Sequence, residues 1–175
     1  MEDLRYPIGK FVPQAFSTAV LDELLLELEV LPKALEFSIQ NLDALQLDEP
    51  YRPNGWTVKQ VIHHVADSHM NALMRIKLTL TEDNPTIKPY EEKDWANLVD
   101  NQTVPINVSL TMVHSIHIKM LALFSSLKAE DWNRTFYHPE NKATTTLWTL
   151  LGIYAWHGKH HVAHINNLRE RKGWY

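Results

Sequence analysis

Four histidines near the C-terminus form the pattern in this chain that is best suited to chemistry. They lie within the string YAWHGKHHVAHI, at His157, His160, His161 and His164. An α-helix turns by about 100° per residue, so these side chains would share one helix face roughly 100° wide. Imidazole is the commonest protein ligand for metals, and histidines four positions apart can bind one ion from a single helix. The pattern therefore predicts a metal site on a C-terminal helix.

The spacing leaves two ligand pairs open on this face. His157 with His161 and His160 with His164 are both separated by four positions. His157 and His161 straddle the direction of the neighbouring apolar residues more closely, whereas His160 lies toward the edge of the face. Geometry alone does not choose between the two pairs.

A third ligand could come from a second helix that contains the string HHVADSH. Catalytic metal sites usually use three protein ligands and keep one position open. When the helix is projected down its axis, His64 borders the apolar stripe, His69 lies within it and His63 lies on the opposite side. We therefore expect His64 or His69 to point inward and His63 to face solvent.

The remaining candidates have weaker signals. Asp67 lies three positions after His64 and could accept a hydrogen bond from a ligand ring, or it could be a solvated carboxylate on a helix surface. His114 and His117 are expected to be ordinary surface or interface histidines. His138, which precedes a proline, is expected in a loop near the cleft.

The helical periodicity predicts four long helices that would position these residues. Their expected ranges are 17–42, 57–80, 106–127 and 146–171. Ser17 should cap the first helix, and Pro32 should kink or divide it. Thr57 and Gln60 form a capping box that should begin the second helix, and Thr146 lies at the start of the fourth.

The segments between these helices read as connections. Residues 1–16 should form an extended arm because they hold two prolines and a glycine. Residues 81–104 show little periodicity and could link two parallel helices, as in bundles with a crossover. Residues 132–137 could be irregular or extended. No long stretch alternates polar and apolar residues, so the fold class should be all-α, a four-helix bundle with at most a minor sheet.

Length and composition favour one soluble globular domain over residues 1–175. A chain of 175 residues can bury one good core. The net charge of −4, without a basic block, gives no electrostatic footprint for nucleic acid or for an anionic membrane. There is no cysteine, so any thiol in the chemistry must come from a cosubstrate. The acidic N-terminus has no signal-peptide pattern, and we expect a cytoplasmic protein.

Five strings spread over nearly the whole chain carry a resemblance to a known family. They are YPIG at 6–9, PYRPNGWTV at 50–58, HHVADSHMN at 63–71, FYHP at 136–139 and YAWH at 154–157. In these strings the chain resembles the DinB-like superfamily and, most closely, its YfiT group of metal-dependent hydrolases. The resemblance implies an up-down-down-up four-helix bundle with a long crossover between the second and third helices. It also implies a homodimer.

The resemblance further implies a ligand set and a metal. Carried over to this sequence, the three metal ligands are His64, His157 and His161, with zinc or nickel as the divalent ion. His164 then stands where the wider superfamily often has a glutamine, and His160 is an additional neighbouring histidine. Both could support the ligands, shuttle protons, serve as alternative ligands or be ordinary core residues.

A three-histidine site would support two reactions on a small molecule. Neutral imidazoles leave the charge of a divalent ion uncompensated, so the ion lowers the pKa of a water or a thiol in its open position. The leading expectation is a metal-dependent hydrolase. The family resemblance adds an alternative, transfer of a low-molecular-weight thiol such as bacillithiol. A non-catalytic metal-binding stress protein and a structural metal site are further alternatives.

Overall fold

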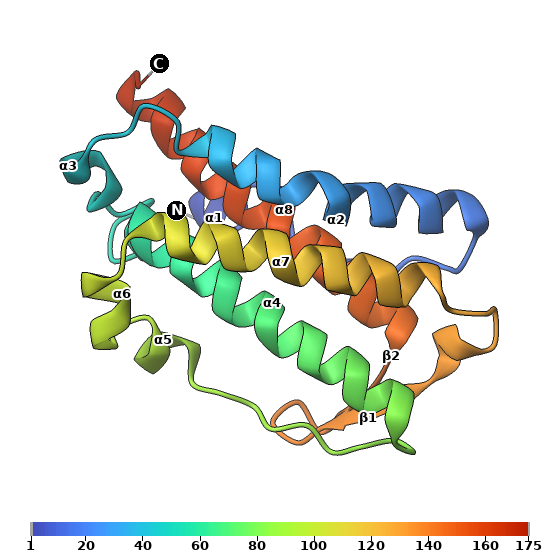
Figure 1. Ribbon diagram of the computed structural model, residues 1–175. Coiled ribbons are helices and arrows are strands. Elements are labelled where there is room, and N and C mark those ends of the chain that lie inside the picture. Colours follow the sequence, from blue (N-terminus) through green and yellow to red (C-terminus); the bar gives the residue numbers. More distant parts are fainter. Residues whose placement is uncertain (1, 175) are drawn as a thin grey trace.

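Four long helices pack side by side in the computed structural model, which describes residues 2–174. They are α2 (Thr18–Ser38), α4 (Val58–Thr81), α7 (Ile106–Ser125) and α8 (Leu147–Lys172). In Figure 1, α2 and α8 run in one direction and α4 and α7 in the other. The predicted bundle, with its up-down-down-up order and its two parallel central helices, is confirmed.

Side-chain caps fix where three of these helices begin. Ser17 accepts a hydrogen bond from the backbone N–H of Val20 at 3.2 Å. At the start of α4, Thr57 and Gln60 exchange side-chain and backbone hydrogen bonds in both directions, at 3.0 and 3.1 Å. Thr146 caps α8 by accepting a hydrogen bond from the backbone N–H of Thr149 at 3.1 Å. The capping residues expected from the sequence are therefore correct, and they satisfy N–H groups that have no partner inside the helix.

The first helix ends earlier than predicted and continues through its proline. It stops at Ser38 and not near Leu42, because Asn41 adopts a left-handed backbone with φ of 64°. Pro32 is buried inside α2 and does not divide the helix. A proline has no N–H, so the carbonyl of Leu28 lacks its usual helical donor one turn later.

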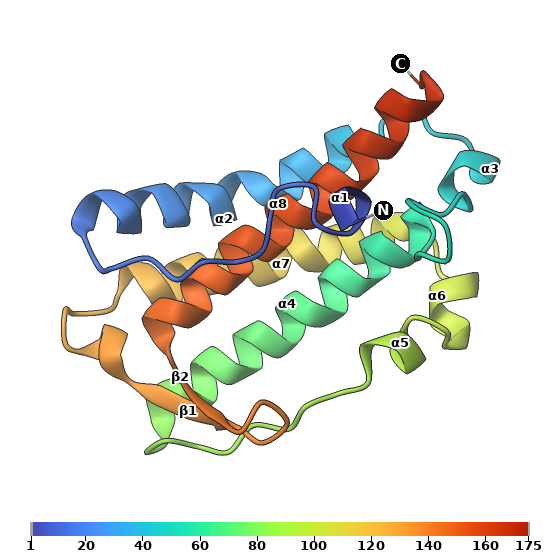
Figure 2. The same ribbon diagram turned by 180° about the vertical axis from the view of Figure 1, so that it is seen from behind.

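The connection between α4 and α7 runs along the outside of the bundle and contains two short helices. These are α5 (Glu92–Trp95) and α6 (Val99–Thr103). Figures 1 and 2 show this segment passing beside α4 before the chain enters α7. Another short helix, α3 (Ala44–Leu47), lies between α2 and α4.

A two-stranded antiparallel hairpin precedes α8. The 3₁₀ turn η1 (Asp131–Asn133) leads into β1 (Thr135–His138), which pairs with β2 (Ala143–Thr146). The sequence left the first of these segments open between irregular and extended, and it did not predict the second strand. The sheet is minor, as expected.

The N-terminal arm lies against α8. It begins with one turn of helix, α1 (Glu2–Arg5), where an extended segment was expected, and residues 6–16 then follow without regular structure. Figure 2 shows this segment crossing α8. The indole N–H groups of Trp148 and Trp156 donate to the carbonyls of Gln14 and Gly9, at 2.7 and 3.2 Å. The arm thus covers one side of the helix that carries the four histidines.

Close packing of α2 on α8 sets the depth of that helix in the bundle. An ideal Cβ placed on Gly158 would lie 2.2 Å from Cδ2 of Leu31, so any larger residue here would force the side chain of Leu31 to move. By length and hydropathy, α7 is the one helix in residues 2–174 that could cross a membrane. Here it packs against α2 and α4, as the core helix of a bundle does.

Candidate metal centre

Three histidine side chains from two helices converge on one point. His64 comes from α4, and His157 and His161 come from α8, one turn apart. Nε2 of His157 lies 3.2 Å from Nε2 of His64 and 3.2 Å from Nε2 of His161. Two nitrogens bound to a tetrahedral zinc ion at the usual bond length are about 3.3 Å apart. The spacing of these nitrogens is therefore the spacing that such an ion needs.

Burial favours the neutral form of all three rings. Burial lowers the pKa of His64 to about 4. Burial, followed by the effect of neighbouring histidines, lowers the pKa of His157 and of His161 well below its usual range. A neutral imidazole keeps one nitrogen lone pair, so the donor set suits a divalent cation. No proton has to be displaced from a charged ring.

The structure brings His69 inward as well, but not into this group. His69 is fully buried, and its Nε2 lies 3.2 Å from Nδ1 of His157. Its other ring nitrogen, Nδ1, lies 2.8 Å from Nε2 of His117. Of the two inward candidates on α4, only His64 therefore presents a nitrogen to the converging set.

Two predictions about histidine exposure are wrong. His63 was expected in solvent but is 4% exposed, and its Nδ1 lies 2.7 Å from Oγ of Ser109 on α7. His117 was expected at the surface or in an interface but is 1% exposed, inside the core of the bundle. The axial projection assumed one buried face per helix, whereas α4 packs against both α7 and α8, and α7 against both α4 and α2. His114, by contrast, is partly exposed and contacts Glu36, as expected.

The other two histidines of α8 are buried beside the centre. Nε2 of His164 lies 3.1 Å from the carbonyl oxygen of Arg5, and its Nδ1 lies 3.4 Å from Nδ1 of His161. His160 stacks on Trp156 with ring centroids 4.5 Å apart. Neither ring belongs to the converging set of residues 2–174.

Asp67 does not hold a ligand ring. Within residues 2–174 its carboxylate makes no hydrogen bond to His64, whose ring packs against Trp56 with centroids 4.5 Å apart. Burial, and then the nearby Asp100, raise the pKa of Asp67 to about 6. Asp67 is half-buried, so the solvated alternative does not describe it fully either.

Two hollows meet at the centre. The first has a volume of about 640 Å³, opens over all three converging histidines and is lined by basic and aromatic residues, among them Arg5, Tyr51, Arg52 and Trp56. The second has a volume of about 490 Å³ and is lined by Arg75, Tyr90, His138, Glu140 and Tyr154. Both are lined by His157, Glu92 and Lys93. Volumes of this size suit small molecules.

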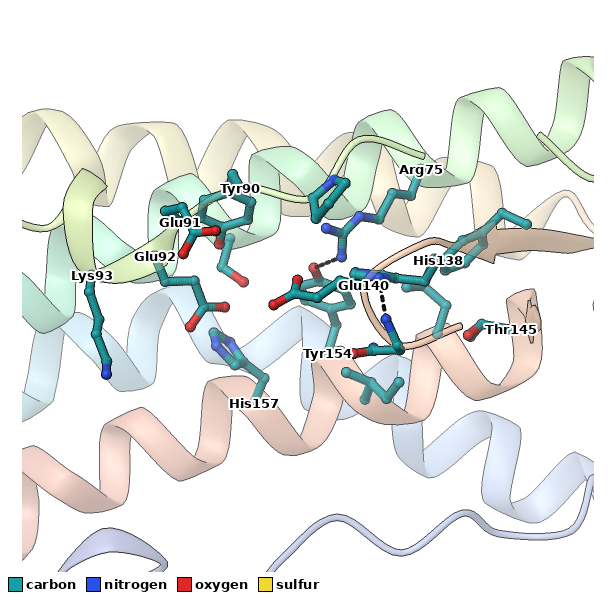
Figure 3. A pocket seen from close by; sticks show the side chains of 16 residues that line it. Arg75, Tyr90, Glu91, Glu92, Lys93, His138, Glu140, Thr145, Tyr154 and His157 are labelled. Carbon is teal, nitrogen blue, oxygen red and sulfur yellow. Dashed lines mark hydrogen bonds between the residues drawn. The ribbon is translucent and has the colours of Figure 1, made fainter. Parts of the chain in front are cut away.

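The second hollow is polar and carries both signs of charge. Figure 3 shows Glu92, Glu140 and Arg75 pointing into it, with His157 at one end. Arg75 donates a hydrogen bond to the hydroxyl oxygen of Tyr154 at 3.3 Å. Burial raises the pKa of Glu92, while Arg75 opposes that shift. The carboxyl of Glu92, an exposed residue that is only partly withdrawn from water, and the guanidinium of Arg75 thus face the same space next to His157.

Comparisons with known proteins place the chain in a family. Residues 27–165 match the model of the DinB superfamily. The chain belongs to the DinB superfamily. A protein of Bacillus cereus (strain 03BB102) named "Putative metal-dependent hydrolase" is 51% identical over 99% of this chain and 100% of its own length. A relative from Bacillus mycoides (strain KBAB4) with the same description has the same identity and coverage.

A solved structure of this superfamily has nearly the same fold. YfiT from Bacillus subtilis, described as "a probable metal-dependent hydrolase with an unusual four-helix bundle topology", is 44% identical. It superposes with a TM-score of 0.96 over 99% of each chain. The predicted resemblance to the DinB-like superfamily and its YfiT group is therefore confirmed.

Within this DinB-superfamily fold, sequence reasoning missed the polar residues of the crossover. Tyr90 and Glu92 line the second hollow, but they lie in a stretch without periodicity that gave no signal. His138 does lie at this hollow, as expected, although at the end of a strand.

Proposed function

We propose that this protein is a metal-dependent enzyme that acts on a small molecule, with a divalent ion held by Nε2 of His64, His157 and His161. The convergence of three neutral imidazole nitrogens with 3.2 Å spacing is the observation that carries the proposal. Three nitrogen ligands without a carboxylate suit zinc best and nickel next. Hydrolysis is the leading reaction, in agreement with the names of the relatives.

The side chains around the ion would divide the remaining work. When bound, the ion supplies positive charge that lowers the pKa of a water or a thiol at its open position. Glu92 is the carboxylate placed to accept that proton, because it lines both hollows together with His157. Arg75 and the hydroxyl of Tyr154 would bind a carbonyl or anionic group of the substrate in the second hollow.

A second candidate function is transfer of a small thiol to an electrophile. The observation that favours it is the presence of two hollows that meet at His157, because a transferase must hold two reactants. The chain has no cysteine, so the thiol would come from a cosubstrate. Arg5 and Arg52 line the first hollow and would suit an anionic thiol there.

The test begins with the metal-free full-length chain. We would reconstitute it with zinc or nickel, measure the bound metal, and assay esters, amides and pairs of a thiol with an electrophile. The His64→Ala variant should lose both the metal and the activity, while His114→Ala, which removes a surface histidine, should keep both. Activity that persists after a chelator has removed the metal, or activity in His64→Ala, would contradict the proposal. Turnover only with an added thiol would identify the transferase.

A further inference from the structure

A histidine that binds a metal through Nε2 must carry its proton on Nδ1. In a neutral imidazole one ring nitrogen carries a proton and the other carries a lone pair. The hydrogen-bond partner of either nitrogen decides which of the two is protonated. Any group that fixes the Nδ1 proton therefore prepares the Nε2 lone pair for the ion. In this chain two such arrangements lead from α8 to a backbone carbonyl.

The first arrangement runs through the core of the bundle and begins at the carbonyl of Leu28. A carbonyl oxygen can only accept, so Nδ1–H of His117 donates to it, at 2.6 Å. Nε2 of His117 is then an acceptor, and Nδ1–H of His69 donates to it at 2.8 Å. Nε2 of His69 is in turn an acceptor for Nδ1–H of His157, at 3.2 Å. Nε2 of His157 is left with a lone pair that faces the other two converging nitrogens.

Two features make this order of protons hold. Pro32 has no N–H for the carbonyl of Leu28, so that carbonyl is free to accept from a side chain. His69 and His117 are 0% and 1% exposed, so water does not compete for their ring nitrogens. Burial also lowers the pKa of His117 to about 4, which favours its neutral form.

The second arrangement is shorter and lies under the N-terminal arm. The carbonyl of Arg5 accepts from Nε2–H of His164 at 3.1 Å. Nδ1 of His164 is then the acceptor for Nδ1–H of His161 at 3.4 Å. Nε2 of His161 is left with its lone pair, by the same logic and with longer bonds.

We propose that His69 and His117 are positioning residues that fix the tautomer and the ring orientation of His157, and so prepare it to bind the ion. His164 does the same for His161. The inference rests on the proposed metal centre for its functional meaning, but the order of protons is a property of the chain itself. It assigns a task to buried histidines that are not ligands.

The order of protons can be measured directly in the full-length chain at a pH of about 8, without metal and with zinc. Long-range ¹H–¹⁵N spectra of the histidine rings distinguish a proton on Nδ1 from one on Nε2. We expect Nδ1–H at His69, His117 and His157 and Nε2–H at His164, in both samples. A proton on Nε2 of either His69 or His117 would overturn the inference.

A matched pair of variants tests the effect on the ion. In His69→Gln the side-chain oxygen can take the place of Nε2 and accept from His157, whereas His69→Leu offers no acceptor. Loss of a group that orients a ligand typically costs about 10- to 100-fold in metal affinity. We therefore expect His69→Leu to bind zinc about 10- to 100-fold more weakly in a competition titration, and His69→Gln to recover most of that loss.

The control is His63→Leu, which removes another buried and hydrogen-bonded histidine of α4 that lies outside both arrangements. Its zinc affinity should match that of the unaltered chain. If the chain binds zinc tightly and His69→Leu binds it equally well, the positioning role is wrong and the metal centre stands. If the unaltered chain binds no metal, the proposed function is wrong. The tautomers measured by NMR in the metal-free chain would then still test the order of protons. Should His69→Leu fail to fold, the spectra of the unaltered chain still decide that order.

Discussion

The two histidines that α8 contributes to the centre lie one turn apart but are supported from opposite sides. His157 is held from the core, through two rings that are almost completely buried and end at Leu28, with distances of 2.6, 2.8 and 3.2 Å. His161 is held by a single ring that ends at Arg5, with distances of 3.1 and 3.4 Å. Both the contact with the carbonyl and the contact with the proposed ligand are thus shorter on the core side, at 2.6 and 3.2 Å, than beneath the arm, at 3.1 and 3.4 Å. We infer that the core side defines the position of the ion.

The third ligand is supported in another manner. Residues 2–174 provide no hydrogen bond to Nδ1 of His64, and the ring is held by packing against Trp56. This ligand comes from α4 and closes the centre from the opposite helix. The three proposed ligands therefore differ in what orients them, although each would offer an ion the same atom, Nε2.

Removing a proposed ligand should have the largest effect on activity. The loss should be equal for His157 on the core side and His161 beneath the arm. The ion is expected to supply several kcal/mol of transition-state stabilisation, so kcat/KM should fall by about 10³-fold or more in His157→Ala and equally in His161→Ala. Steady-state assays and metal analysis of both variants would check this. An activity in either variant close to that of His114→Ala, the surface control, would show that the ion is not held there.

The next effect concerns Glu92, which lines both hollows with His157, whereas His161 lines only the first. If Glu92 accepts a proton in the reaction, Glu92→Gln should lower kcat by about 10²-fold or more, as general-base removal does. Metal content should stay unchanged. Glu91→Gln is the matched control, because Glu91 lines only the second hollow. Equal rates in the two variants would remove Glu92 from the mechanism.

The pH dependence of the free energy of unfolding tests whether His117, in the core, is kept neutral by the fold. Burial holds the pKa of His117 at about 4, against 6.5 in the unfolded chain. Above pH 6.5 the ring is neutral in both states. As the pH falls from 6.5 to 4, the unfolded chain takes up a proton that the folded chain refuses, so stability is lost, by up to ~3 kcal/mol at the lower end.

The variant His117→Gln lacks this ring and isolates its contribution. Both proteins would be unfolded with urea at several pH values in the presence of a chelator. The free energy of unfolding should depend less on pH in the variant between pH 6.5 and 4. Groups that titrate in both proteins cancel in the difference. Parallel profiles would mean that His117 is not kept neutral by the fold.

The smallest expected effect is the loss of zinc affinity when His164, beneath the N-terminal arm, is replaced. His164→Leu removes the support of His161, but the two bonds that it breaks, at 3.4 Å to His161 and 3.1 Å to Arg5, are each longer than the corresponding bonds of His69, at 3.2 Å to His157 and 2.8 Å to His117. Zinc affinity should therefore fall by no more than about 10-fold, the lower end of the usual range. Zinc competition titrations of His164→Leu and His69→Leu, run together, compare the two sides. A greater loss in His164→Leu would reverse the proposed order of importance.

The sequence predicted the helices well because they are encoded locally. Capping residues such as Thr57 and Thr146 mark helix starts whatever the tertiary packing is. The end of α2 was missed because a left-handed residue, Asn41, stops it before its apolar pattern ends. The strand over Ala143–Thr146 was missed because four residues are too few to show alternation.

The candidate centre was predictable only in part. Helical spacing narrows the candidates on α8 to two pairs, His157 with His161 and His160 with His164. The choice of the first pair, like the choice of His64 over His69, required the family resemblance. The burial of His117 had a local signal, since it lies four positions after Val113 and three before Met120, both buried. Its bond to Leu28 had none, because it depends on how α7 and α2 pack and on a carbonyl that Pro32 leaves free.

The most direct test of the central claim is to locate the ion. Anomalous diffraction at the zinc edge, from crystals of the zinc-loaded chain, shows where the metal lies and which atoms bind it. We predict one ion about 2.0–2.1 Å from Nε2 of His64, His157 and His161, the usual zinc–nitrogen distance. An ion bound through Nδ1 of any of these rings, or at His160 and His164 instead, would contradict the account.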